Sequence, residues 1–379
     1  MYIRKLNIEK EKELSFFLWG ARQTGKSTLL KYLFPDSLYY DLLLSDVFEE
    51  LYRYPSSIRE TVLALEPKTP VIIDEVQKIP RLLNEIHWLI ENTKTQFILC
   101  GSSPRKILRK GENLPGGRAL KFELLPLSYS EIPEFDLTKA LNSGLIPNHY
   151  ISNDPQKLLK AYIGNYLQDE IIAEAKLRNF PSFTRFLEVA ALTNGEMVNY
   201  TNIASECGVS SPTVKAYFQI LIDSMLGREV PSYKKKPKRR VIHAPKFYFF
   251  DLGIVNFLSR QFRIESGSPA FGKAFEHFLY MEIYAYSQYS GKDFPISYWR
   301  TASQLEVDFV LGQHEVTIEI KSSKHVNNRH LKGLKAFSQE YKVKKSIVVS
   351  QDAQPRLINN IVILPWEIFL KKLWNGEIL

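Results

Sequence analysis

One eight-residue run constrains this chain more than any other feature. Residues 20–27 read G-x-x-x-x-G-K-S, the pattern of a loop whose backbone N–H groups cradle phosphate oxygens. An apolar strand (16–19) precedes it and a helix (27–33) follows it, the arrangement that this chemistry requires. The residues expected to contact a nucleotide are Gly20, Ala21, Arg22, Gln23, Thr24, Gly25, Lys26, Ser27 and Thr28. Of these, Lys26 is expected to reach the β- and γ-phosphates, and Ser27 to hold Mg²⁺.

The composition is that of an ordinary globular chain. Of its 379 residues, 45% are hydrophobic and 24% charged, and 50 Lys and Arg against 41 Asp and Glu give a net charge of +9. The length predicts two or three domains. The basic excess suits an anionic partner such as nucleic acid, although a basic protein without such a partner fits it equally well. Two distant cysteines exclude a disulfide framework, and no signal segment or membrane-spanning run is apparent, so we expect a cytoplasmic protein without membrane contact.

A second nucleotide motif lies at residues 70–75, Pro-Val-Ile-Ile-Asp-Glu. It reads as a buried strand with acids at its carboxyl end, where ligands bind in open α/β sheets. Asp74 is expected to hold Mg²⁺, and Glu75 to polarise an attacking water. The alternative is an acidic cap of a helix. Together with Lys26, these acids predict hydrolysis of ATP rather than binding alone.

A third strand (96–101) is followed by small polar residues. Ser102 is placed to sense the γ-phosphate through a hydrogen bond. Arg105 and Arg118 are candidates for an arginine finger, supplied within the subunit or by a neighbour. Each also fits a solvated surface arginine. A finger supplied by a neighbour would imply a homo-oligomer.

Residues 14–133 resemble the AAA+ ATPases of the AAA_14 kind. The resemblance rests on the loop at 20–27, Val71–Pro80, Gly101-Ser102-Ser103, Gly117-Arg118 and Glu123–Ser128. It implies ATP and Mg²⁺ as cofactors, with Lys26, Ser27, Asp74 and Glu75 in the nucleotide motifs. By the same resemblance, Ser102 takes the sensor position and Arg118 that of the family's Gly-Arg.

The middle of the chain is predicted to be helical. Helices are expected over 154–179, 183–192, 200–207 and 211–221, the last two forming a helix-turn-helix. A run of six cations in seven residues, 234–240, lies where the wing of a winged helix would be. The cations expected to contact a DNA backbone without sequence specificity are Lys215, Lys234, Lys235, Lys236, Lys238, Arg239 and Arg240. The alternative is a packing module whose charge run is a solvated hairpin.

Residues 303–321 are expected to form a hairpin that gathers acidic side chains. A four-residue turn at 312–315 places Asp308 opposite Glu319. Opposed carboxylates repel, and a divalent cation between them removes the conflict. Lys321 shares the face of Glu319 and is placed to orient or deprotonate a water. Asp308 and Glu319 are therefore candidate metal ligands, and Glu319 and Lys321 candidate catalytic residues.

A helix beginning near residue 271 adds Glu276 as a further candidate metal ligand. The pattern, Asp followed by Glu-x-Lys, is that of PD-(D/E)xK nucleases. In the alternative, Lys321 pairs with Glu306, which the same register places opposite it. Asp308 and Glu319 would then lie at the solvated end of the sheet.

Residues 170–325 resemble the DUF4143 region that commonly follows the AAA_14 ATPase. The shared stretches are 245–253, Gly272-x-x-Phe275-Glu276, Leu305–Phe309 and Ile318–Ser323. The resemblance implies a restriction-endonuclease-like fold. His277 departs from the family's usual Asn beside the helical Glu.

We therefore predict an α/β chain of three domains. They are a P-loop AAA+ parallel sheet with flanking helices (1–149), a helical and winged-helix domain (150–265) and a nuclease-like α/β domain (266–379). The expected function is ATP hydrolysis with Mg²⁺, coupled to action on DNA. The alternatives are a DNA-binding ATPase with an inactive nuclease-like domain, and a nucleotide-dependent switch that binds proteins only.

Overall fold

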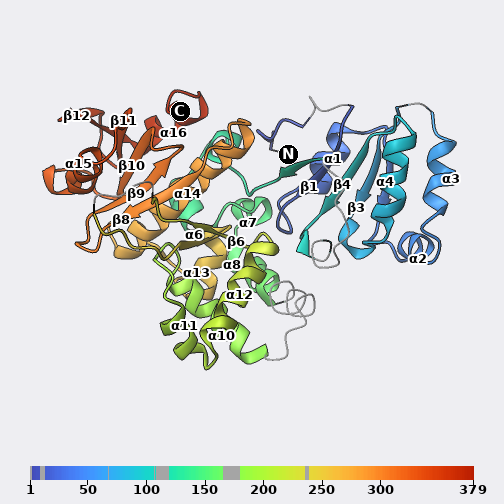
Figure 1. Ribbon diagram of the computed structural model, residues 1–379, viewed down its shortest axis with the longest axis horizontal. Coiled ribbons are helices and arrows are strands. Elements are labelled where there is room, and N and C mark those ends of the chain that lie inside the picture. The colour runs from blue at the N-terminus through green and yellow to red at the C-terminus, as the bar shows by residue number, and fades with distance from the viewer. Residues whose placement is uncertain are drawn as a thin grey trace. The chain divides into compact units, whose positions relative to one another are not determined.

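The computed structural model describes residues 2–8, 13–66, 68–105, 107, 119–164, 180–234 and 239–379. Its contacts divide the chain into two compact units (Figure 1). The N-terminal unit comprises Ile3–Pro126 and Ile220–Leu226. The C-terminal unit comprises Met1–Tyr2, Leu127–Gln219 and Gly227–Leu379.

A five-stranded parallel sheet forms the centre of the N-terminal unit. Its strands are β1 (Ser15–Trp19), β2 (Leu38–Asp41), β3 (Val71–Asp74), β4 (Phe97–Gly101) and β5 (Ala119–Glu123). They run in the order β2-β3-β4-β1-β5. β1, β3 and β4 are buried along their whole length, as expected of apolar strands covered on both faces. The predicted parallel sheet is confirmed.

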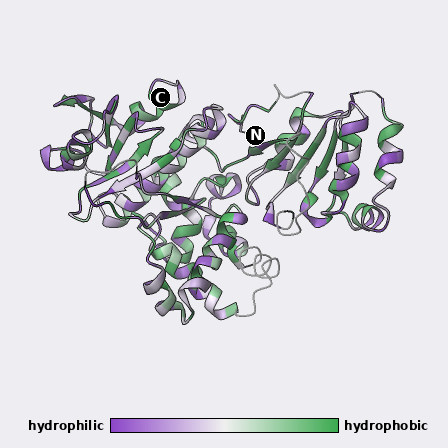
Figure 2. Ribbon diagram, viewed as in Figure 1, coloured by the Kyte–Doolittle hydropathy of each residue, from purple (hydrophilic) through white to green (hydrophobic). Residues whose placement is uncertain are grey.

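Helices cover this sheet. They are α1 (Lys26–Leu33), α2 (Ser45–Arg53), α3 (Ser57–Leu63), the 3₁₀ turn η2 (Val76–Lys78) and α4 (Leu82–Asn92). Because side chains alternate along a strand, β1 serves two cores. Phe17 and Trp19 pack in one cluster with α2, α3 and α4, while Phe16 contacts Phe34 just after α1. The strands are hydrophobic, whereas the helices carry one hydrophobic and one hydrophilic face (Figure 2).

The first part of the C-terminal unit is mostly helical. Its elements are η3 (Tyr129–Glu131), α6 (Leu137–Ser143), α7 (Pro147–Ile151), α8 (Pro155–Ala161), α10 (Phe180–Leu192), α11 (Tyr200–Cys207), α12 (Ser211–Asp223), β6 (Gly227–Val230), β7 (Lys246–Phe249) and α13 (Leu252–Leu258). The end of α12, from Ile220, is counted with the N-terminal unit. Asn199 caps α11, and Gly208 ends it with a φ of 64°. The predicted helices at 183–192, 200–207 and 211–221 are confirmed. Of the helix predicted at 154–179, residues 165–179 lie outside the described residues.

A six-stranded mixed sheet follows, in the order β12-β13-β11-β10-β9-β8. Its strands are β8 (Ile296–Arg300), β9 (Glu306–Leu311), β10 (Val316–Lys321), β11 (Lys345–Ser350), β12 (Arg356–Ile358) and β13 (Ile361–Pro365). The helices are α14 (Pro269–Tyr289), η5 (Asn328–Leu331), α15 (Lys332–Ser338) and α16 (Trp366–Trp374). Residues of α14 and α16 share a core with Phe309 and Ile318, and residues of α15 share another with Val310 and Val348. The sheet is thus covered on both faces.

Within the described ranges, every helix is too short or too polar to cross a membrane.

Candidate functional site

The predicted phosphate loop lies between β1 and α1. Gly25, with a φ of 94°, immediately precedes α1, so the helix N-terminus faces the loop. A Cβ on Gly20 would collide with the carbonyl oxygen of Leu124, which explains the glycine there. Thr24 Oγ1 donates to the carbonyl of Ala21 at 3.0 Å and holds the turn closed. The predicted contact residues therefore form the loop (20–25) and the first residues of α1 (26–28).

Lys26 is folded back onto this loop. Its Nζ donates to the carbonyl oxygens of Gly20 at 2.8 Å and Ala21 at 3.0 Å, and the side chain is buried. These neutral acceptors satisfy the ammonium group without cancelling its charge. A nucleotide phosphate would replace them with charged oxygens, which make stronger hydrogen bonds.

Two hydroxyl groups donate hydrogen bonds to one oxygen atom of Asp74, a predicted Mg²⁺ ligand. Ser27 Oγ donates to Asp74 Oδ2 at 2.6 Å, across 47 residues of sequence. The hydroxyl of Tyr39, on β2, donates to the same Oδ2 at 2.5 Å. Burial and the neighbouring Asp74 together raise the pKa of Tyr39, so the hydroxyl keeps its proton. A hydroxyl and a carboxylate beside the loop suit the oxygen ligands that Mg²⁺ takes.

Glu75 is held away from Asp74. Its backbone is left-handed, with a φ of 60°, which costs a residue with a Cβ roughly 1 kcal/mol. Its Oε2 accepts a hydrogen bond from Gln77 and lies 3.4 Å from Ser102 Oγ. Gln77 also donates to Ser102 at 3.0 Å. The predicted base and the predicted sensor are therefore joined in one buried network.

The structure describes one of the two predicted arginine fingers, Arg105. Arg105 is buried, and its Nη1 lies 3.5 Å from Asp223 Oδ2 within the N-terminal unit. Arg118 lies outside the described residues. Arg4 is a further arginine beside the loop, which the sequence analysis missed. It donates to the carbonyls of Thr24 at 2.7 Å and Leu125 at 2.6 Å.

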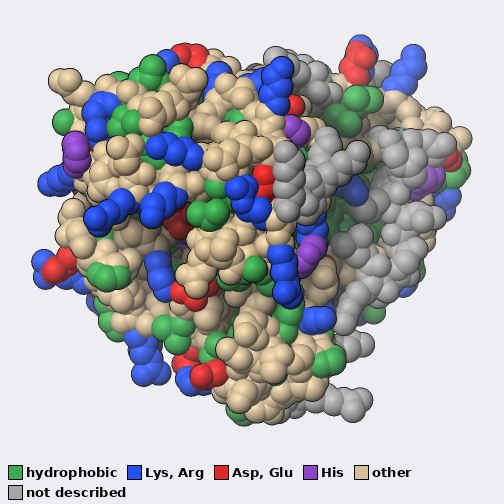
Figure 3. Space-filling model, turned by 60° about the vertical axis from the view of Figure 1, so that its left-hand side comes forward, with side chains coloured by type: hydrophobic (Ala, Val, Ile, Leu, Met, Phe, Trp, Pro, Cys, Tyr) green, Lys and Arg blue, Asp and Glu red, His purple; other side chains and the backbone are tan. Residues whose placement is uncertain are grey.

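The structure describes four of the predicted DNA-binding cations, of which three are exposed and one is held in an ion pair. Lys215, whose ammonium group lies 5.2 Å from the ring centre of Tyr200, is exposed, as are Lys234 and Arg240. Arg239 is instead held by Glu340 and by the carbonyl of Ala336 at 3.0 Å. Lys235, Lys236 and Lys238 lie outside the described residues. Lysine and arginine side chains are spread in several groups over the face seen in Figure 3.

The segment that joins β6 to β7 contains the basic run predicted to lie at a wing. β6 and β7 pair as antiparallel strands, and the described residues at each end of the segment form isolated bridges with β8 and with the residue after it. Tyr233 N donates to the carbonyl of Tyr298 at 2.7 Å, and Ile242 N to that of Arg300 at 2.9 Å. Both ends of the basic run are therefore anchored on the edge strand of the mixed sheet.

In the C-terminal unit, β9 and β10 have the predicted register. Ile318 pairs with Phe309, and the same register places Glu319 opposite Asp308, where regular pairing has ended. Asp308 Oδ2 accepts from the backbone N–H of Ile320 at 2.7 Å. Lys321 Nζ contacts Glu319 Oε1 at 2.6 Å rather than Glu306. Both carboxylates are buried, unlike in the alternative of a solvated sheet end.

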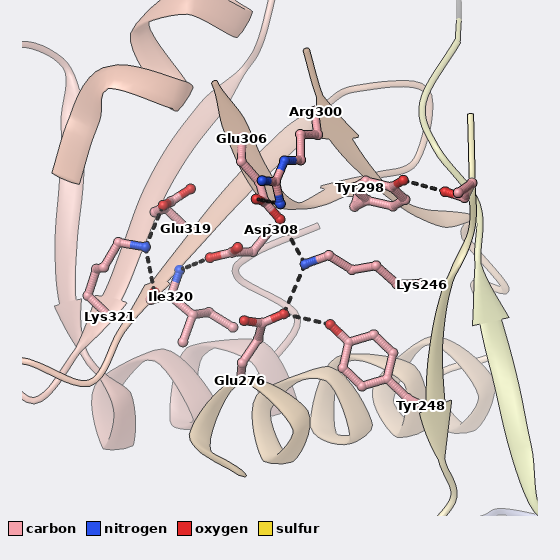
Figure 4. Close-up of polar contacts among 11 residues, drawn as sticks. Lys246, Tyr248, Glu276, Tyr298, Arg300, Glu306, Asp308, Glu319, Ile320 and Lys321 are labelled. Atoms are coloured by element: carbon pink, nitrogen blue, oxygen red, sulfur yellow. Dashed lines mark hydrogen bonds and ion pairs between the residues drawn. The ribbon is translucent and has the colours of Figure 1, made fainter. Parts of the chain in front are cut away.

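Glu276, on α14, belongs to the same cluster (Figure 4). Its Oε1 accepts from Lys246 Nζ at 3.1 Å and from the Tyr248 hydroxyl at 2.6 Å. Lys246 also contacts Glu306 Oε1 at 2.9 Å, and Arg300 holds the other oxygen of Glu306 at 3.0 Å. Two of the three predicted metal ligands of this unit, Glu276 and Glu319, are therefore each paired with a lysine.

The carboxylates perturb one another. Burial and, next, Glu276 raise the pKa of Asp308 to about 6. Burial and Asp308 raise the pKa of Glu319 well above its usual range. Burial is the largest single influence on Lys246 and opposes its charge, but Glu276 and the other acidic neighbours together outweigh it, so the pKa of that ammonium group rises. The buried acidic and basic side chains of the cluster thus shift one another's pKa values.

The fit of a metal to this cluster is mixed. Glu319 Oε2 is a buried acceptor with no hydrogen-bond partner, which a cation would satisfy. However, within the described parts of the chain, no group of three or more His, Cys, Asp and Glu side chains is arranged to hold a metal ion.

The parallel sheet and the phosphate loop define an AAA-type ATPase domain. A family described as an AAA domain, AAA_14, matches residues 12–133. A family described as a domain of unknown function, DUF4143, matches residues 271–369. Another domain of unknown function, DUF8612, matches residues 134–265. The stretch at 245–253, on which the resemblance to DUF4143 partly rested, falls in this middle match.

Relatives and solved structures give more distant likenesses. The chain is 24% identical over 306 residues to uncharacterized proteins of Mycobacterium bovis (Mb2031c) and Mycobacterium tuberculosis (Rv2008c). These matches cover 77% of this chain and 66% of each relative, slightly under two thirds of the relative's length. The Walker-type ATPase PABY2304 of Pyrococcus abyssi is 15% identical with a TM-score of 0.43, over 67% of this chain and 93% of that one. The ORC1 protein of Aeropyrum pernix, solved in complex with DNA, is 11% identical with a TM-score of 0.26, over 65% and 86%.

Six polar residues at these sites were missed from the sequence: Arg4, Tyr39, Gln77, Lys246, Tyr248 and Arg300. Gln77 lies in the quoted 71–80 stretch, and Lys246 and Tyr248 lie in the quoted 245–253 stretch, but neither stretch assigned them a role. The alternation of Lys246 and Tyr248 along one strand indicates only a shared face. Nothing in the sequence links that face to Glu276, 30 residues away from Lys246.

Proposed function

We propose that the N-terminal unit hydrolyses ATP with Mg²⁺. The observation that carries this proposal is the meeting of Ser27 Oγ and Asp74 Oδ2 at 2.6 Å beside the phosphate loop. In this proposal the loop N–H groups and Lys26 bind the phosphates. Bound Mg²⁺ would be held at Ser27 and Asp74 and would neutralise developing charge on the phosphates.

Glu75 would orient the attacking water and accept its proton. For this, its carboxylate must turn from Gln77 and Ser102 toward the γ-phosphate. The hydrogen bonds that these two side chains make to Glu75 support a resting position for the base. Ser102 would then be free to contact the γ-phosphate as a sensor, and Arg118 to stabilise the transferred charge.

Two substitutions test the proposal. Glu75→Gln keeps the shape of the side chain but removes the base, and should lower kcat by about 100- to 10,000-fold while ATP still binds. Lys26→Ala should abolish both nucleotide binding and turnover. The control is Lys94→Ala, because Lys94 is exposed and precedes β4 at the opposite end of the strands. Turnover that survives Glu75→Gln would show that this residue is not the base.

We propose, as a second activity, that the C-terminal unit acts on DNA and cleaves it with a divalent metal. Glu319 Oε2 favours this, because a buried carboxylate oxygen without a partner is costly unless a ligand satisfies it. Asp308 lies opposite Glu319, and Lys321 would orient the water. Lys215, Lys234 and Arg240 are exposed and would contact the phosphate backbone without sequence preference.

Incubation of the full chain with single- and double-stranded DNA and Mg²⁺ or Mn²⁺ tests this activity. Cleavage should disappear in the Asp308→Ala/Glu319→Ala variant and persist in Glu265→Ala, which removes an exposed acid. Binding without cleavage on every substrate would leave a DNA-binding ATPase with an inactive nuclease-like domain. Absence of binding at low salt would favour a switch that acts on proteins.

We also propose a cytoplasmic location, since Cys100 and Cys207 are both free and buried. A homo-oligomer would follow if Arg118 acts across a subunit interface.

A further inference from the structure

We propose that the ammonium group of Lys246 is a built-in cation of the carboxylate cluster, and that it occupies a position for which a divalent metal ion would compete. The proposal rests on the metal-dependent role proposed above for Asp308 and Glu319. It explains why the cluster has abundant carboxylates but no ready three-ligand metal site.

The position of Lys246 is that of a bridging cation. Its Nζ lies 3.1 Å from Glu276 Oε1 and 2.9 Å from Glu306 Oε1, between α14 and β9 (Figure 4). The side chain is only 4% exposed. Tyr248, two residues along β7, donates to the same oxygen of Glu276 at 2.6 Å. One strand therefore supplies both the charge and a hydrogen bond to that carboxylate.

The acids of the cluster outnumber its bases. Four acidic side chains, Glu276, Glu306, Asp308 and Glu319, lie with three basic ones, Lys246, Lys321 and Arg300. Lys246 pairs with both Glu276 and Glu306, whereas the unpartnered Glu319 Oε2 lies at the end of the cluster remote from Lys246. Glu276 and Glu306 are therefore the carboxylates that would become available to a metal ion without Lys246.

A cavity gives access to Lys246. It measures about 360 Å³, and Asn194, Lys246, Lys273, Glu276, Arg300 and Glu306 are among the residues that line it. Lys273 pairs with Glu196 at this cavity, at 2.5 Å, and both side chains are about half exposed. A hydrated metal ion can therefore approach Glu276 and Glu306 from solvent once Lys246 no longer holds them.

A purely structural lysine would give a different result from a competing one. If Lys246 only joins β7 to α14 and β9, its removal destabilises the fold without creating metal affinity. If it stands in for a cation, its removal exposes two carboxylates that bind a divalent ion. Metal binding, measured without nucleotide or DNA, separates these two roles.

The experiment titrates Mn²⁺ into the full chain and measures free Mn²⁺ by electron paramagnetic resonance. Lys246→Met should bind one additional Mn²⁺, or bind Mn²⁺ at least tenfold more tightly than the wild type. Lys273→Met removes a lysine from the same cavity and should behave like the wild type. Adding Glu276→Gln to Lys246→Met should abolish the gain. Equal Mn²⁺ binding by Lys246→Met and the wild type, including no binding by either, would overturn the proposal.

Unfolding of Lys246→Met would not prevent the test. The Lys246→Met/Glu306→Gln variant removes one charge of each sign and leaves Glu276 available, so it too should gain Mn²⁺ affinity. Its melting temperature should rise on addition of Mn²⁺, whereas that of the wild type should rise less. The proposed nuclease activity fails on a separate result, the absence of DNA cleavage by the wild type, so the two failures are distinguishable.

Discussion

The nucleotide site and the carboxylate cluster use the same kinds of side chain in opposite ways. At the nucleotide site, Lys26 donates to backbone carbonyls, and Asp74 accepts from the hydroxyls of Ser27 and Tyr39. At the cluster, Lys246 and Lys321 form direct ion pairs with carboxylates. The charged side chains Lys26 and Asp74 are therefore held by neutral groups, whereas most charged side chains of the cluster are paired with an opposite charge.

This difference shows what a charged motif does not reveal by itself. A lysine and two acids can bind a charged ligand only if they do not already neutralise each other in ion pairs. Neutral hydrogen-bond partners orient Lys26 and Asp74 without neutralising their charges. Lys26 can then bind a phosphate, and Asp74 a cation such as Mg²⁺. Ion pairs instead favour a stable, closed network unless a ligand displaces one partner.

The largest expected effect comes from replacing each lysine by methionine. Lys246→Met leaves buried Glu276 and Glu306 without their shared partner and should destabilise the C-terminal unit by about 3 kcal/mol. Lys26→Met removes two hydrogen bonds to backbone carbonyls and should cost the N-terminal unit only about 1 kcal/mol. Hydrogen exchange of amides in β9 and β10, and in β1 and β3, measures the two losses separately. Equal losses would contradict the comparison.

The stability of the C-terminal unit should also depend on pH, through the buried side chain of Glu282. Burial raises the pKa of Glu282 to about 8, although the carboxylate accepts from Trp374 Nε1 at 2.9 Å and Tyr129 N at 2.7 Å. The folded chain then keeps a proton that the unfolded chain releases near pH 4.5. The stabilising proton is present at low pH and lost as pH rises, so the C-terminal unit should lose about 2 kcal/mol between pH 6 and 8.

Hydrogen exchange of the mixed sheet at several pH values measures this loss. Glu282→Leu should reduce the pH dependence, and the part that remains belongs to Asp308 and Glu319, whose pKa values burial also raises. Glu134→Leu, which replaces an exposed acid close to η3 in the sequence, should keep the wild-type slope. Parallel profiles for Glu282→Leu and the wild type would show that Glu282 does not contribute.

A smaller effect is expected from Tyr39 at the nucleotide site. Tyr39→Phe removes the hydroxyl that orients Asp74 and should weaken the Mg²⁺ dependence of ATP binding about tenfold. Fluorescent-nucleotide titrations at several Mg²⁺ concentrations measure this without relying on turnover. Tyr40→Phe is the matched control, because Tyr40 packs against the core on the other face of β2. Unchanged Mg²⁺ dependence in Tyr39→Phe would show that Ser27 alone positions Asp74.

Much of the fold could be predicted from local patterns. The apolar runs before Gly20 and Asp74 are long enough to mark buried strands, and Gly208 marks the turn between two helices. The register of β9 and β10 followed from a four-residue turn, because side chains alternate strictly along strands. These features depend on residues close together in the sequence.

The rest depends on contacts between distant segments. Lys246 reaches Glu276 across 30 residues, and Tyr39 reaches Asp74 across 35, so no spacing rule indicates either pair. The basic run between β6 and β7 was predicted to lie at a wing. The described residues on either side of it form two isolated bridges, to Tyr298 and Thr301, which leave no periodic pattern in the sequence.

The smallest expected effect extends the comparison to the basic run. Lys234 is exposed and available to a phosphate, whereas the charge of Arg239 is already paired with Glu340. Lys234→Ala should therefore reduce the slope of log affinity for DNA against log salt by about 1, and Arg239→Ala should leave it unchanged. Fluorescence anisotropy of labelled DNA at several salt concentrations measures both slopes, with melting temperatures confirming that each variant folds. Equal reductions would mean that Arg239 leaves Glu340 for DNA, and the ion pair would then be a displaceable one like that inferred for Lys246.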